Sequence, residues 1–153
     1  MSRSRPGGEM IRRSIAALFA AAVLAAVPAF AEAQVPVRVR VIKGSRQGPA
    51  SVDKRLDDLK RQLSPLAYVK WEQVDEKKLD LAQGQPQFVS LPGGDDVGVT
   101  LQEKRGDTVT IEVALAARNT QSRLTIEKGQ RIVHQVSAEK GGSAFFITVL
   151  AWP

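Results

Sequence analysis

The stretch VGVTLQEKRGDTVTIEVALA, residues 97–116, decides the fold class because it predicts a β-hairpin. Apolar residues alternate with polar ones on both sides of a central KRGD segment, which is the period of half-buried strands. Gly106 and Asp107 are residue types that tolerate the backbone angles of a tight turn. The tripeptide Arg105-Gly106-Asp107, which elsewhere serves as an adhesion signal, therefore has a structural explanation as the turn between two strands.

The same two-residue period continues through most of the chain on both sides of this hairpin. Turn-forming residues separate the strands at about 8 to 12 residues, a spacing typical of an antiparallel sandwich. The final strand is apolar on both faces, so we expect it to be central in its sheet and covered on both sides. The alternation predicts strands over residues 35–41, 67–74, 78–82, 87–91, 97–103, 108–116, 122–127, 131–138 and 143–152.

One amphipathic helix is expected between the first two strands. Asp53 suits the first turn because its carboxylate accepts hydrogen bonds from free amides, and Pro65 disfavours helical geometry at the residue before it. The apolar residues at helical spacing are Val52, Leu56, Leu59 and Leu63. We therefore predict a mainly β (α+β) fold, an antiparallel β-sandwich of about nine strands with one short amphipathic helix.

Residues 1–33 have the features of a secretory signal peptide. Four arginines precede the apolar run SIAALFAAAVLAAV, and small-x-small cleavage sites end at Ala31 and Ala33. The apolar run is shorter than the roughly 20 residues that span a bilayer, so an uncleaved membrane anchor is the less favoured alternative. We expect cleavage near Ala31 or Ala33, a periplasmic or secreted protein without a transmembrane segment, and a single domain over residues 34–153.

Composition limits the classes of function that remain. The chain has no cysteine, which excludes disulfides, thiolate metal sites and a thiol nucleophile. The net charge of +6 falls to +4 when residues 1–33 are removed, because 18 basic and 14 acidic residues remain. That mild charge in an exported protein argues against nucleic-acid binding.

Few residues are candidates for chemistry. His134 is the only histidine, and it lies in step with two apolar residues, as a face-buried or edge histidine does. Adjacent acids such as Asp95-Asp96 lack the spacing of a calcium loop and are explained as turn residues. We therefore predict no catalytic residues, no metal site and no cofactor.

A candidate for a ligand or partner surface is the aromatic strand that follows the helix. Trp71 is set between Lys70 and Glu72, and Tyr68 lies three residues before it. Core packing is the default role for such aromatics. The surface that we consider consists of Trp71, Tyr68 and Lys70.

The segments VDKRLDDLKRQL, AYVKWEQVDEKKLDLAQGQPQFVSLPGG and TVTIEVAL occur in the order of a helix, an aromatic strand and a turn leading to Leu-Pro-Gly-Gly. Over about residues 35–150 this order resembles small exported bacterial proteins of unassigned function. In the turn itself the chain has Leu81-Ala82-Gln83-Gly84-Gln85, which departs from their Leu-Gly-Gln-like pattern. The resemblance implies a β-rich fold with one helix and an exported location, and it implies no catalytic residues.

Two classes of function remain open at this point, with a hydrolase as a third. The first is a non-enzymatic interaction or accessory module with an envelope protein partner, because strands and hairpins are present without a convergent chemical constellation. The second is a domain that binds a small molecule or a polysaccharide through Trp71 and neighbouring polar residues. The oligomeric state is left open.

Overall fold

The computed structural model describes residues 34–153, so the predicted signal peptide, residues 1–33, lies outside the described residues. Within residues 34–153 the chain forms nine strands and three short helical segments. The strands are β1 (Val35–Ser45), β2 (Ser51–Val52), β3 (Lys70–Leu81), β4 (Gln87–Ser90), β5 (Asp96–Arg105), β6 (Thr108–Leu115), β7 (Thr120–Glu127), β8 (Arg131–Gln135) and β9 (Ser143–Ala151). The helical segments are η1 (Lys54–Leu59), α1 (Lys60–Leu63) and η2 (Ala116–Arg118).

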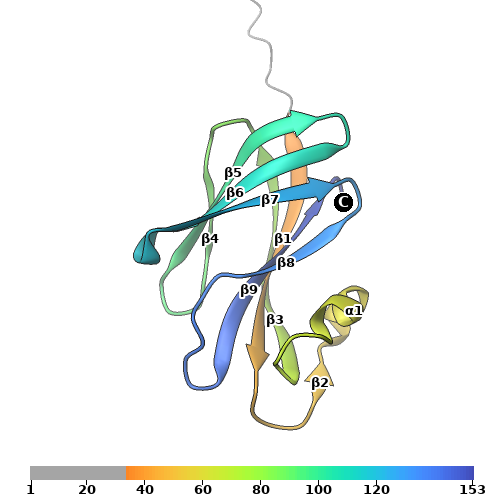
Figure 1. The fold of residues 1–153 in the computed structure, drawn as a ribbon, viewed down its shortest axis with the longest axis vertical. Coiled ribbons are helices and arrows are strands. Elements are labelled where there is room, and N and C mark those ends of the chain that lie inside the picture. The colour runs from red at the N-terminus through yellow and green to blue at the C-terminus, as the bar shows by residue number, and fades with distance from the viewer. Residues whose placement is uncertain (1–33) are drawn as a thin grey trace, which may run out of the picture.

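The described strands form two sheets that face each other. Sheet A has the order β2-β3-β1-β9-β8, and sheet B has the order β4-β5-β6-β7 (Figure 1). All strand pairs are antiparallel except β2 with β3. The main apolar core joins the two sheets, and its members include Val37, Val39, Ile147 and Val149 from sheet A and Val99, Leu101, Ile111 and Val113 from sheet B. The predicted mainly β sandwich is confirmed.

The hairpin that was predicted from residues 97–116 is formed by β5 and β6. Val99 pairs with Val113 and Leu101 with Ile111, so the apolar residues of both strands share the inner face. Gly106 in the turn has a φ of 57°, a left-handed conformation that glycine adopts without a steric penalty. The turn explanation of the Arg105-Gly106-Asp107 tripeptide is confirmed.

The helix differs from the prediction in its geometry. The segment expected to be one amphipathic helix is the 3₁₀ helix η1 followed by one α-helical turn, α1. A 3₁₀ helix places residues i and i+3 on the same face, so Leu56 and Leu59 both point to the sheet, and the α-turn adds Leu63 four residues later. As expected, the Asp53 carboxylate accepts a hydrogen bond from a first-turn amide, that of Arg55, at 3.0 Å.

Two of the predicted strands are one strand in the structure. Residues 67–74 and 78–82 were expected to be separate, but β3 runs from Lys70 to Leu81 through the charged segment between them. The register with β1 shifts between Val41 and Ile42, which leaves Val74 as an extra residue in a β-bulge. Beyond its short contact with β2, β3 is an edge strand, and its charged side chains face water there, which explains why its alternation is interrupted. The two-residue strand β2 was not predicted.

The final strand is central, as predicted. β9 pairs with β1 on one side and with β8 on the other. Ile147 and Val149 face the main core, whereas Phe146 faces a second apolar core that η1 and α1 cover. Figure 1 shows α1 beside sheet A, away from the strands of sheet B. The protein therefore has three layers in this region, which are sheet B, sheet A and the helical segment.

Candidate functional site

Trp71, from the predicted surface, belongs to the second apolar core. Its side chain is 3% exposed, and its ring centroid lies 5.1 Å from that of Phe146 and 5.7 Å from that of Tyr68. Gly44 makes this packing possible, because a Cβ there would lie 2.9 Å from atoms of both the Tyr68 and the Trp71 rings. The burial of Trp71 follows from its position in β3 beside Gly44 of β1.

The same aromatic rings border a hollow of about 360 Å³ beside α1. Tyr68 is partly exposed and Val69 is exposed, so the hollow opens to solvent. Lys70 does not line it; its ammonium lies 3.2 Å from the Glu72 carboxylate. The lining residues are Ala50, Val52, Lys60, Leu63, Ser64, Tyr68, Val69 and Trp71.

A charged cluster fastens η1 to sheet A. Arg40 of β1 is 5% exposed, and its guanidinium donates two hydrogen bonds to the Asp58 carboxylate, at 2.6 and 3.1 Å. It also donates to the carbonyl of Arg55 at 2.9 Å, and Arg131 of β8 donates to Asp58 at 2.7 Å. The hydrogen bonds from Arg40, followed by its charge and that of Arg131, hold the pKa of Asp58 below its usual value. The cluster is structural, since every charged group in it has a partner.

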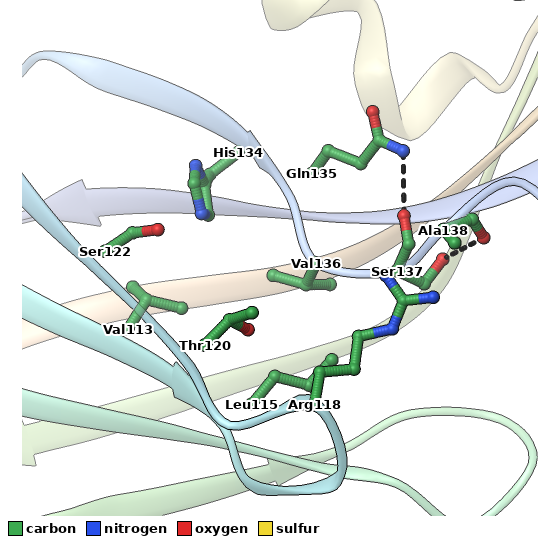
Figure 2. Close-up of a pocket in the computed structure, with 10 residues that line it drawn as sticks. All are labelled: Val113, Leu115, Arg118, Thr120, Ser122, His134, Gln135, Val136, Ser137 and Ala138. Carbon is green, nitrogen blue, oxygen red and sulfur yellow. Dashed lines mark hydrogen bonds between the residues drawn. The ribbon is translucent and has the colours of Figure 1, made fainter.

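A concave region lies along one side of the sandwich, where β7 ends sheet B and β8 ends sheet A. It consists of two adjoining cavities of about 330 and 700 Å³, which share four lining residues, and we call it the β7–β8 groove. Figure 2 shows the smaller cavity, with Thr120 and Ser122 of β7 on one side and His134 of β8 on the other. The shared residues are Leu115, Arg118, Ser137 and Ala138.

The larger cavity continues the β7–β8 groove past the end of the sheets. Its lining beyond the shared residues comes from Lys43 near the end of β1, the β4–β5 connection, the β8–β9 connection and the start of β9. In Figure 2 the Arg118 side chain reaches toward Ser137, at the junction of the two cavities. The lining beyond the shared residues is Lys43, Pro92, Gly93, Asp95, Glu139, Lys140, Gly141, Ser143 and Phe145.

Hydrogen bonds fix the wall of the groove that follows β8. The Ser137 hydroxyl accepts a hydrogen bond from the amide of Phe145 at 2.8 Å, and the Gln135 side chain donates to the Ser137 carbonyl at 2.7 Å. Arg46 forms an ion pair with Glu139 and lies over the Tyr68 ring at 5.0 Å. These contacts give the groove a preformed wall.

His134 lies on the edge strand β8 and lines the smaller cavity, in agreement with the prediction of an edge histidine. Burial lowers the pKa of His134, so its imidazole is neutral at neutral pH. No carboxylate is among the residues that line this cavity, and no side-chain hydrogen bond within residues 34–153 orients the ring. A nucleophile at Ser122 would therefore have no oriented base in this geometry.

Asp95 and Asp96, the predicted turn acids, lie at the junction of the β4–β5 connection and β5. Asp96 accepts a hydrogen bond from the Ser90 hydroxyl at 2.8 Å, across the β4–β5 pair. Across residues 34–153, no group of three or more metal-ligating side chains converges. None of the helices in that range is long and apolar enough to cross a membrane.

The β7–β8 groove was not predicted from the sequence. One signal for it is present in β1, where the inward positions Val35, Val37, Val39 and Val41 are followed by Lys43. Lys43 pairs with Phe145 and is half-buried at the end of the core. A lysine at an inward position marks a place where the sandwich opens.

The fold and the groove define a class of protein, a two-sheet antiparallel β-sandwich with an open side between its edge strands. Comparison of the chain with protein-family models, with curated proteins and with solved structures finds no match. The likeness to small exported bacterial proteins therefore remains a prediction.

Proposed function

We propose that the protein is a non-enzymatic interaction module of the bacterial envelope that binds an extended segment of an envelope protein partner in the β7–β8 groove. One observation carries this proposal. The smaller cavity lies along the side where β7 and β8 each have a strand neighbour on one edge only among the described residues, and the larger cavity continues from it past the ends of the sheets. The free edge of a strand offers backbone hydrogen-bonding groups at the spacing of a further strand.

The lining of the β7–β8 groove favours a peptide over a sugar chain. Leu115, Val136 and Phe145 supply apolar contacts, and Thr120 and Ser122 supply hydroxyl groups. Sugar rings are commonly held against exposed aromatic faces, whereas Phe145 is the one aromatic residue in the lining of either cavity. A peptide backbone, in contrast, can pair with β7 or β8 directly.

The exported location in this proposal is supported by residues 1–33, with their basic start, apolar run and small-residue cleavage sites. The non-enzymatic role is supported by the surroundings of His134, which has neither a carboxylate partner nor a hydrogen-bonded nucleophile in its cavity. Edge strands of other sandwich proteins recruit partners through the backbone without any reaction.

Site-specific photo-crosslinking in intact native cells tests this proposal. A benzophenone amino acid at Thr120, inside the groove, should form a reproducible covalent adduct with one envelope protein. The matched control places it at Thr110, which lies on the outer face of β6, and should form no such adduct. Mass spectrometry of the adducts names the partner. Absence of any protein adduct from Thr120, or the same adduct from both positions, would contradict the proposal.

A second candidate function is favoured by the hollow beside α1. Its volume of about 360 Å³ is in the range of small-molecule sites, and Tyr68 and Trp71 form part of its wall. In this case the protein would bind a small molecule or a short saccharide there. In the Trp152→Phe variant Trp71 is the sole tryptophan, so a ligand-dependent change in its fluorescence would support this alternative, and a monomer that captures no protein partner would favour it over the interaction module.

A further inference from the structure

We infer that the partner segment held in the β7–β8 groove is acidic, with apolar side chains alternating with Asp or Glu. This inference rests on the proposed function and adds the chemical class of the ligand. Three cationic residues carry it, namely Lys43, Arg118 and Lys140, which line the larger cavity together. Arg118 also lines the smaller cavity, so positive charge is present at the junction of the two.

The three cations come from separate elements that the fold brings together. Lys43 ends the inward row of β1, Arg118 ends η2, and Lys140 lies in the β8–β9 connection. None of the three forms an ion pair with any residue in the range 34–153. Cations that do have a carboxylate partner in that range are Arg38, Arg40, Arg46, Arg55, Lys60, Lys70, Arg105 and Arg131.

The carboxylates of the larger cavity do not balance these charges. Glu139 is engaged by Arg46, whose hydrogen bond and charge hold the pKa of Glu139 below its usual value. Asp95 is the remaining carboxylate in the lining. Three cations against Asp95 leave two positive charges unbalanced in a concave region, where the field of fixed charges is concentrated. His134 is neutral at neutral pH and adds no charge.

The floor of the β7–β8 groove explains why apolar side chains should alternate with the acidic ones in the partner segment. Leu115 and Val136 are buried and Phe145 is half-buried, and all three contribute to the main core. Successive side chains of an extended peptide point to opposite sides. A segment that turns its apolar side chains to this floor therefore presents the intervening side chains to the rim, where carboxylates meet Arg118 and Lys140, while Lys43 lies beside Phe145 at the end of the floor.

Selection from a phage-displayed library of random decapeptides on the purified protein tests the inference. The enriched peptides should contain an excess of Asp and Glu at alternate positions. The variant Lys43→Gln/Arg118→Gln/Lys140→Gln should bind the best enriched decapeptide about ten- to a hundredfold more weakly, since each exposed ion pair contributes about two- to fivefold. The control variant Lys54→Gln/Arg61→Gln/Lys77→Gln changes net charge equally outside the groove and should bind as the wild type does.

The other outcomes separate the inference from the proposed function. Enriched peptides that are neutral or basic, or a groove variant that binds them as tightly as the wild type, would overturn the acidic ligand. In that case the groove function stands if a benzophenone at Thr120 still crosslinks to the peptide. If no decapeptide is enriched, the inferred acidic peptide is wrong, and the proposed function is then decided by whether a benzophenone at Thr120 forms a protein adduct in intact cells. If polygalacturonate binds to the groove cations while no peptide does, the ligand is an acidic polysaccharide and the inferred peptide is wrong.

Discussion

A chain that ends at Gly142, without residues 143–153, should be insoluble when it is expressed. The deletion removes β9, so β1 and β8 both lose a strand neighbour in sheet A. Burying a large apolar side chain contributes about 1.5 to 3 kcal/mol, so four of them contribute about 6 to 12 kcal/mol. That is comparable to the entire free energy of unfolding of a typical domain, about 5 to 15 kcal/mol. The four in β9 are Phe146, Ile147, Val149 and Leu150.

A shorter deletion provides the control for this prediction. Ending the chain at Ala151 keeps β9 and removes only Trp152 and Pro153. Trp152 is half-buried, and its amide donates one hydrogen bond to the Pro36 carbonyl at 2.9 Å. We expect this variant to be soluble with a lower Tm, as followed by circular dichroism. If the chain ending at Gly142 were soluble and melted cooperatively, β9 would be peripheral and the sheet order of sheet A would be wrong.

The substitution Asp58→Ala should lower the free energy of unfolding by about 3 kcal/mol, because removal of one partner of a buried ion pair leaves the other charge uncompensated. The Arg40 side chain is 6% exposed, and Asp58 is the carboxylate that neutralises it. Urea denaturation at pH 7 measures the loss. The expected value is at the lower end of the usual range, because the Asp58 side chain is 32% exposed.

Asp57 provides a matched control one residue away. Its carboxylate pairs with Lys60, both side chains are more than half exposed, and Asp57→Ala should change stability by less than about 0.5 kcal/mol. The double variant Arg40→Met/Asp58→Leu removes the buried Arg40 charge together with its partly exposed partner and should recover most of the stability. Equal stabilities of Asp58→Ala and Asp57→Ala would show that the charged cluster does not fasten η1 to the sheet.

The effect of Asp58 should also depend on pH in a defined direction. The pKa of Asp58 is lowered in the folded protein by the hydrogen bonds from Arg40. Its contribution is therefore fully present above the unfolded value of about 3.9 and is lost as the pH falls through the folded pKa. The difference in stability between the wild type and Asp58→Ala should accordingly shrink in acid.

The features that were predicted correctly depend on residues close together in the chain. Two-residue alternation located the strands of the hairpin in residues 97–116, and the apolar faces of residues 143–152 indicated a central strand. The spacing of Leu56, Leu59 and Leu63 identified a buried helical face. The spacing did not distinguish an α-helix from a 3₁₀ helix. The type of helix depends also on contacts with sheet A, which include the hydrogen bond from Arg40 to the Arg55 carbonyl.

The features that were missed depend on the order of strands in the sheets. The β7–β8 groove exists because two strands that are close in sequence end two different sheets, and no local pattern specifies this. Lys43 and Lys140 are nearly 100 residues apart, yet they line one cavity. Trp71 lies in a segment of alternating residues, and the alternation alone does not decide which face of the strand its side chain occupies. Its burial depends on Gly44, which comes from β1.

Amide hydrogen exchange followed by NMR on the protein alone tests the open side of the sandwich most directly. We predict that alternate amides of β7 and β8 exchange rapidly, because each strand has a neighbour on one edge only among residues 34–153. Amides along β1 and β9, which have a strand on both sides, should exchange slowly throughout. Uniformly slow exchange along both β7 and β8 would contradict the account, since it would show that no free strand edge borders the groove.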